Sequence, residues 1–452
     1  MTFYVECTHT YHTELNTGIQ RVVRNVVNNS INLDYLDISP VIFSNGKFIP
    51  INTALLYPRQ VSRDVNLGAR LRYCFSVFIK YINNIIYHSR HLVAAIVPIP
   101  VFSKFMTTPR DKFGLSWIIH QAYRKTFSVL TKGKINESAP VDPKAGDVLV
   151  LLDSSWHLDV WPTVKAMRRN GVKVIWVCYD IIPVSHSEFC DEHLVNVFTR
   201  WVSDAINQSD AVVCISKSTA QLVEERFLEM APLRKEAPPI THFWLGSELD
   251  GQIVGNTHSI VRKEVRVAFS KNLPVYIFVG TIEPRKNHSY ALDAFDILWE
   301  KGGDAVFLIA GRIGWLCDDL VNRIFDHDEF QDKLFMFNDL SDDELAWIYE
   351  NANGLIFSSI VEGFGLPIVE ALQRSLPVFA SDIPVFKEIG AEGVQFFDLD
   401  NPQELASLIE KHIERGANRL SQPVKWLTWK ESAYQFWERV ADCLKKTDFP
   451  SA

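Results

Sequence analysis

Two glutamates with seven residues between them flank a glycine-containing turn in the last third of this 452-residue chain. Glu362 precedes the turn, and Glu370 lies about one helical turn into the segment that follows it. An apolar run at 355–358 comes before the turn, and Pro367 suits the first turn of a helix. The residues that could present backbone groups to a ligand here are Gly363, Phe364, Gly365 and Leu366.

A strand, a glycine turn and a helix start favour an anion, because free N–H groups and the positive end of the helix dipole point at one spot. Carboxylates at the same place repel phosphate and instead accept hydrogen bonds from hydroxyl groups. Glu362 and Glu370 therefore indicate a ligand with hydroxyls, such as a sugar. An ordinary helix start with an N-terminal acid and a solvated surface acid would give the same pattern.

Two adjacent cations follow another apolar run, at 274–279, which ends at Gly280. Arg285 and Lys286 precede a helical pattern at 290–300. An arginine can fork onto two oxygens and a lysine adds a point charge, so the pair suits a diphosphate. The alternative is a solvated basic turn, which is less attractive because helix N-termini disfavour cations.

Further candidates follow the strands expected in the first half of the chain. Gly18 opens a helical pattern and could let the backbone approach a ligand, although a plain helix start would look the same. Asp180 and His186 follow the apolar run 172–178, and parallel sheets bind ligands beyond the carboxyl ends of their strands. A turn-capping aspartate and an ordinary loop histidine are the alternatives.

The elements that must position these residues alternate between continuous apolar runs and helical patterns. This alternation predicts an α/β protein with two doubly wound, Rossmann-like domains, at residues 1–250 and 260–425. A proline-containing and polar stretch at 229–272 is the expected linker. Residues 426–452 contain a Trp-rich amphipathic helix, which we expect to pack back on the N-terminal domain.

Composition narrows the class of protein. Net charge is −8, which gives no overall case for nucleic-acid binding. The seven cysteines form no CxxC pair, which favours a reducing compartment and argues against a zinc site. The first residues lack the pattern of a secretion signal, and no apolar run reaches the ~20 residues of a membrane span. We therefore expect a cytoplasmic protein that needs no metal or other cofactor.

Residues 59–134 differ from the rest, with thirteen basic and two acidic residues interleaved with aromatic and aliphatic ones. Such a segment fits an insertion that lies on an anionic membrane surface, so the protein could be peripheral at the inner face of the plasma membrane. A helical excursion that packs on the first domain with a solvated basic face is the alternative. No recognition motif for RNA accompanies the basic residues.

With both glycine elements placed, the chain resembles glycosyltransferase family 4, whose members are retaining enzymes of the GT-B architecture. The resemblance rests on Gly280-Thr-Ile-Glu-Pro-Arg-Lys-Asn and on Glu362-Gly-Phe-Gly-Leu-Pro-Ile-Val-Glu370, the family's E-x7-E motif. It covers about residues 275–440 strongly and the first half more loosely. Thr281 departs from the pattern, because many relatives have an arginine there. The resemblance implies two Rossmann-like domains that face a central cleft.

The resemblance also implies roles for individual residues. Arg285 and Lys286 would bind the diphosphate of a nucleotide sugar, Glu362 would contact the transferred sugar, and Glu370 would accept hydrogen bonds from the ribose. Asp180 and His186 are the first-domain candidates for contacting sugar or acceptor hydroxyls. The full set of implied donor-binding residues is Gly18, Gly280, Arg285, Lys286, Asn338, Leu340, Glu362, Gly363, Phe364, Gly365, Leu366 and Glu370.

The function expected from the resemblance is transfer of a hexose from a nucleotide sugar, with mannose from GDP-mannose as the first choice. The acceptor would be a glycan or a lipid-linked oligosaccharide in bacterial surface polysaccharide biosynthesis. A nucleotide-sugar epimerase of the same architecture and a non-catalytic nucleotide-sugar-binding protein are the alternatives. A dinucleotide dehydrogenase is weaker, because no G-x-G-x-x-G follows any expected strand.

Overall fold

The computed structural model describes residues 1–13, 18–31, 33, 36–52, 56, 139–232, 234–248, 261–390 and 392–448. The predicted basic insertion at 59–134 lies outside these residues, as do residues 249–260 of the expected linker. Met1–Leu56 and Val141–Ala452 belong to one compact unit, which contains two separate β-sheets.

The first sheet has seven strands in the order β3-β2-β1-β4-β5-β6-β7. All neighbours are parallel except β2 and β3, a hairpin whose turn residues Asn45 and Gly46 both have positive φ. The bounds are β1 Thr2–Glu6, β2 Asp37–Ser44, β3 Lys47–Pro50, β4 Val148–Leu151, β5 Lys173–Cys178, β6 Ala211–Cys214 and β7 Ile240–His242.

The helices of this part of the chain are α1 Thr8–His12, α2 Gly18–Ser30, α6 Trp161–Arg169, α7 Ile182–Ser185, α8 Glu192–Gln208, α9 Lys217–Glu225 and α10 Phe227–Met230. A short 3₁₀ helix, η2, spans Ser187–Phe189. Every residue of β4 and of β6 is buried, as expected for parallel strands covered on both faces.

The second sheet has six parallel strands in the order β10-β9-β8-β11-β12-β13. Numbered from its own first strand, this order is 3-2-1-4-5-6, the doubly wound arrangement. The strand bounds are β8 Val275–Val279, β9 Val306–Ala310, β10 Leu334–Phe337, β11 Gly354–Phe357, β12 Val378–Ser381 and β13 Val394–Phe397. β8 and β11 are therefore the neighbours between which the chain changes its winding direction.

The helices of the second half are α11 Lys263–Phe269, α12 His288–Glu300, α13 Asp318–Phe325, α14 Asp342–Asn351, α15 Leu366–Leu372, α16 Pro384–Ile389, α17 Pro402–Glu414 and α18 Trp429–Asp448. A 3₁₀ turn, η4, spans Pro284–Lys286. No helix within the described residues has the length and apolar content needed to span a bilayer.

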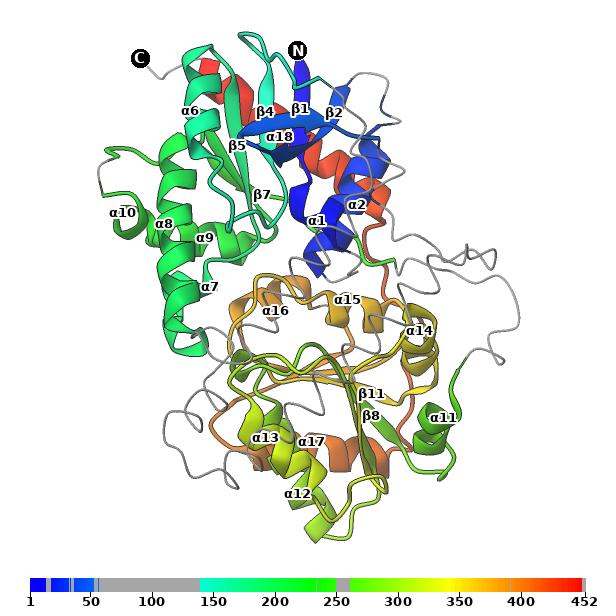
Figure 1. Cartoon of the computed structure of the whole chain (residues 1–452). Helices are drawn as coiled ribbons and strands as arrows, with labels where there is room; N and C mark the ends of the chain where they lie inside the picture. The colour runs from blue at the N-terminus through cyan, green and yellow to red at the C-terminus, as the bar shows by residue number, and fades with distance from the viewer. Residues whose placement is uncertain are drawn as a thin grey trace, which may run out of the picture. The chain divides into compact units, whose positions relative to one another are not determined.

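The last helix, α18, packs on the first sheet's side of the molecule, beside α2 (Figure 1). Trp437 donates its indole N–H to Ser30 Oγ at 2.6 Å, and its ring meets Phe3 edge-on at 5.0 Å. Arg439 donates to the backbone oxygen of His242 at 3.1 Å. The tryptophans of this helix thus serve core packing, and the chain ends against the domain in which it began.

Candidate active site

The glycine turn after β11 has the conformation that its sequence predicts. Gly365 takes a φ of +116°, where a side chain would be strained, and a Cβ there would also lie 3.0 Å from the Phe386 ring. α15 begins at the next residue with Pro367 in its first turn. Phe364 is buried and anchors the turn in the core. The backbone of this segment is therefore fixed beside the end of β11.

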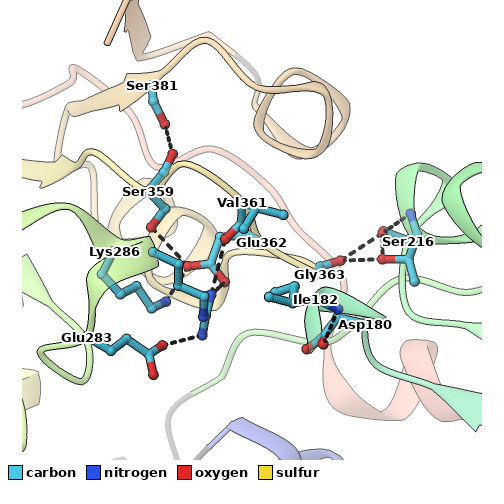
Figure 2. A network of polar contacts seen from close by, with 12 residues as sticks. Asp180, Ile182, Ser216, Glu283, Lys286, Ser359, Val361, Glu362, Gly363 and Ser381 are labelled. Carbon is cyan, nitrogen blue, oxygen red and sulfur yellow. Dashed lines mark hydrogen bonds and ion pairs between the residues drawn. The ribbon is translucent and has the colours of Figure 1, made fainter. Parts of the chain in front are cut away.

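The cations that follow β8 lie at the same edge of the sheet and are bonded to Glu362 (Figure 2). Arg285 Nη1 lies 2.7 Å from Glu362 Oε2, and Lys286 Nζ is bonded to Glu362 Oε1. Ser359 Oγ donates to the same carboxylate at 2.9 Å. Arg285 Nη2 also pairs with Glu283 Oε1 at 2.6 Å. The structure thus joins the predicted diphosphate-binding and sugar-binding residues in one cluster at the switch point.

Burial and charge pull the pKa values of this cluster in opposite directions. Burial acts to raise the pKa of Glu362, but the charges of Arg285 and Lys286 outweigh it and lower the pKa to about 2. Burial lowers the pKa of Lys286, and the ion pair with Glu362 acts against that change. Burial raises the pKa of Glu283 and of Asp180. Glu362 is therefore ionised at neutral pH, and a bound diphosphate would compete with it for both cations.

Asp180 lies next to this cluster, two residues beyond the end of β5. Gly363 packs so closely on this strand end that a Cβ would lie 2.1 Å from Tyr179 O and 3.2 Å from Asp180 Cβ. Ser216 Oγ and Thr219 Oγ1 donate to Gly363 O at 2.8 and 3.1 Å (Figure 2). The carboxyl ends of β5 and β6 therefore meet the glycine turn of the second sheet.

A second contact between the two halves involves Glu388 on α16. Its carboxylate accepts hydrogen bonds from the N–H groups of Lys217 and Ser218 at the start of α9, at 2.6 and 2.8 Å. It also accepts the indole N–H of Trp244 at 2.8 Å. The carboxylate satisfies helix N–H groups that have no partner within the helix. This contact holds α9, and with it Ser216, near the glycine turn.

Glu370 is buried and both of its oxygens are bonded within the chain. Arg21 Nη1 on α2 lies 2.5 Å from Oε1, and the Tyr349 hydroxyl donates to Oε2 at 2.9 Å. Gly18 begins the same helix, and a Cβ on it would lie 3.8 Å from Leu366 Cδ1, which is an ordinary contact. The predicted ribose-binding glutamate and the predicted glycine loop are thus brought together, through an arginine that the sequence analysis did not select.

The remaining predicted residues lie at the edge of the cluster or outside it. Gly280 lies against Lys286, since a Cβ there would be 3.6 Å from Lys286 Cε. His186 is half-buried, and its Nδ1 lies 2.8 Å from Ser185 Oγ. Asn338 is exposed and Leu340 half-buried, both beyond the end of β10. Their predicted contact with a base therefore stays a prediction.

The carboxyl ends of β1 and β4 hold a buried pair of acids that the sequence analysis missed. Glu6 accepts hydrogen bonds from Thr8 N at 2.7 Å and Ser155 Oγ at 2.9 Å, while Asp153 accepts from Thr10 N at 2.6 Å. Burial, and then the charge of Asp153, raise the pKa of Glu6 to about 7. The position of each acid at the end of an apolar run was the available signal in the sequence; their closeness and burial depend on β1 and β4 being neighbours in the sheet.

Glu6→Gln is expected to remove a loss of stability that the wild-type protein shows as pH rises. The pKa of Glu6 is higher in the folded protein than its ordinary 4.5, so protonation of Glu6 stabilises the folded state. This contribution to the free energy of unfolding is fully present below pH ~4.5 and is lost, by ~3 kcal/mol, as pH rises through about 7. Thermal unfolding between pH 4.5 and 8 measures this slope. Glu192→Gln, at an exposed position on α8, is the control, and an unchanged slope in Glu6→Gln would contradict the assignment.

No group of three or more His, Cys, Asp or Glu side chains in the described part of the chain is arranged to hold a metal ion.

The two-sheet architecture is that of the GT-B fold, and solved structures of this class match the whole chain. The Anabaena protein Alr3699/HepE in complex with UDP and glucose superposes with a TM-score of 0.53 at 13% identity, covering 99% of this chain and 100% of that one. Sucrose-phosphate synthase from Thermosynechococcus elongatus gives 0.51 at 14%, covering 99% and 98%. The predicted fold class is confirmed.

Comparison of sequences points to a more particular group. Residues 262–425 match the family model described as "Glycosyl transferases group 1". The serotype-specific mannosyltransferase WbdA of Escherichia coli is 35% identical over 308 residues, which is 67% of this chain and 38% of that protein. The O-antigen chain mannosyltransferase RfbU of Salmonella typhimurium is 29% identical over 175 residues, 38% of this chain and 48% of that protein. The chain spans less than half the length of these curated relatives.

Proposed function

We propose that this chain is a retaining glycosyltransferase of family 4 that transfers a hexose from a nucleotide sugar to a glycan or lipid-linked oligosaccharide. The observation that carries the proposal is the buried cluster of Arg285, Lys286 and Glu362 at the switch point of the second sheet. The match of residues 262–425 to a glycosyltransferase family model supports it. Surface polysaccharide biosynthesis is the process proposed, since the named relatives are O-antigen or serotype-specific enzymes.

Mannose from GDP-mannose is the proposed donor. The relatives named above are mannosyltransferases, and the HepE structures that share the fold contain UDP or UDP-glucose.

In the proposed reaction the bond from the sugar C1 to the phosphate oxygen breaks while C1 bonds to an acceptor hydroxyl oxygen on the same face. Negative charge grows on the leaving diphosphate, and Arg285 and Lys286 would stabilise it there. The acceptor proton passes to an oxygen of the leaving phosphate. Glu362, held ionised by the same cations, would contact the sugar as positive charge develops on its ring. Asp180 and His186 would bind hydroxyl groups, and no metal is required.

Incubation with GDP-mannose and α-mannobiose tests the proposal. The expected product is a trisaccharide whose new linkage has the α configuration of the donor, read from its anomeric NMR signals. Inversion at the new linkage would contradict retention. Conversion of the donor to another nucleotide sugar without acceptor would indicate the epimerase, and binding without any conversion would indicate the non-catalytic alternative.

We also propose that residues 59–134 attach the protein to anionic membranes. Thirteen basic residues support this, since each contributes ~1 kcal/mol near such a surface. Flotation with vesicles rich in phosphatidylglycerol at low salt should carry the protein upward, and vesicles of phosphatidylcholine alone should not. Absence of flotation with both kinds of vesicle would overturn the attachment.

A further inference from the structure

An exposed apolar segment follows β9, directly beside the cation cluster. Ile313, Trp315 and Leu316 fall within four consecutive residues and are 42%, 40% and 64% exposed. Large apolar side chains in such a group are uncommon on a surface that binds nothing. The proposed reaction gives no role to these three side chains.

The backbone of this segment is fixed against the residues that carry the cluster. Ile282 N donates to Arg312 O at 2.8 Å, and Gly314 N donates to Ile282 O at 2.9 Å. A Cβ on Gly314 would lie 2.6 Å from Ile282 O and 3.5 Å from Glu283 Cβ. Trp315 therefore directly follows a residue, Gly314, that is hydrogen-bonded to Ile282, just before η4 and its two cations.

The edge of the Trp315 ring is anchored as well. Its indole N–H donates to Phe189 O at 2.9 Å. The Phe189 ring stacks on His186, with centroids 6.2 Å apart and planes 11° from parallel. Phe189 ends η2, which follows the strand end that carries Asp180. The hydrogen bond fixes the orientation of an indole that remains 40% exposed.

We propose that Trp315 is a stacking platform for a pyranose ring of the acceptor glycan. One face of a pyranose carries C–H bonds, whose weakly positive hydrogens are attracted to the negative face of an indole. The hydroxyl groups at the edge of the pyranose can then reach the polar groups nearby, Asp180 and His186 among them. The inference rests on the proposed function and adds to it the place of the acceptor sugar.

The position of Trp315 favours the acceptor over the donor sugar. Its hydrogen-bond partner Phe189 belongs to the first domain, residues 1–250, which is the expected acceptor side and carries Asp180 and His186, the candidates for sugar or acceptor hydroxyls. The proposed donor contacts lie in the second half, where Arg285 and Lys286 are both bonded to Glu362. A ring on Trp315 would thus lie against both halves.

A binding experiment tests the platform without requiring turnover. The protein is labelled with 5-fluorotryptophan, and the ¹⁹F NMR signal of Trp315 is the one that disappears in Trp315→Phe. Addition of α-mannobiose is expected to shift that signal. No shift at saturating α-mannobiose, or a shift caused only by GDP-mannose, would overturn the acceptor platform, whether or not the protein transfers mannose.

Kinetics give the second measurement. Trp315→Ala is expected to raise the acceptor KM by about 5- to 10-fold, a size typical of lost aromatic contacts, with the KM for GDP-mannose unchanged. Trp315→Phe should recover most of the loss. Tyr434→Ala is the matched control, because it removes an exposed aromatic ring elsewhere, on α18. It should leave the acceptor KM unchanged. An unchanged acceptor KM in Trp315→Ala would contradict the proposal, while failure of the wild-type protein to transfer mannose would contradict only the proposed function.

Discussion

Lys286→Ala is expected to lower kcat for hexose transfer by about 10²- to 10³-fold, the usual effect of removing one group that stabilises charge in a transition state. Lys286 is buried at 8% exposure, so its charge acts on the leaving diphosphate with little screening by water. Arg285 would remain, bonded to both Glu362 and Glu283, and cannot replace a second cation. Glu362→Gln should lower kcat as well, since the ionised carboxylate beside the sugar would be lost.

Loss of activity must be separated from loss of fold, because removing one partner of a buried ion pair costs about 3–5 kcal/mol. Lys286→Met combined with Glu362→Gln removes both charges and keeps the side-chain lengths. Lys387→Ala on α16, which removes an exposed lysine paired with Asp382, is the matched control for charge. If Lys286→Ala or the double variant folds and keeps kcat within threefold of wild type, a margin of about 0.7 kcal/mol, the cluster does not stabilise the leaving diphosphate.

The second large effect is expected for Gly363→Ala. The backbone of Gly363 would accept an alanine, but the added Cβ would lie 2.1 Å from Tyr179 O, a backbone atom that cannot turn away. The glycine turn must then move away from the end of β5, which breaks the hydrogen bonds from Ser216 and Thr219 and separates Asp180 from Glu362. A displacement of about 1 Å in a reacting assembly can lower kcat 10²-fold.

Gly18→Ala supplies the contrast, because its Cβ would make only an ordinary 3.8 Å contact with Leu366. We expect Gly363→Ala to lower kcat much more than it weakens binding of GDP, since the diphosphate cations stay on the second sheet. Gly18→Ala should keep the thermal stability of the wild type. Wild-type kcat in Gly363→Ala would show that the approach of β5 to the glycine turn has no role in the reaction.

The sequence predicted the second sheet well, because most of its strands are continuous apolar runs. The apolar run 274–279 forms β8 Val275–Val279, and the apolar run 355–358 overlaps β11 Gly354–Phe357. β2, β3 and β7 were missed, since they are short or partly exposed and lack that pattern.

The site residues were predictable by type, but their pairing was not. A motif shows that Glu362 and Lys286 belong to one site, yet the ion pair between them depends on β8 and β11 being neighbours. Arg21 looked like a polar residue of an amphipathic helix, because its partner Glu370 lies 349 residues away. Glu283 and Asp180 have raised pKa values only because the fold buries them.

Binding of nucleotides tests most directly whether Arg285, Lys286 and Glu362 form a diphosphate site. Thermal unfolding is measured with GDP, GDP-mannose, UDP and UDP-glucose for the wild type, Lys286→Ala and the control Lys387→Ala. A nucleoside diphosphate and its sugar should stabilise the wild type and Lys387→Ala, by ~2.7 kcal/mol at 100 times Kd, and should leave Lys286→Ala nearly unchanged. No stabilisation of the wild type by any of the four, or equal stabilisation of Lys286→Ala, would contradict the account.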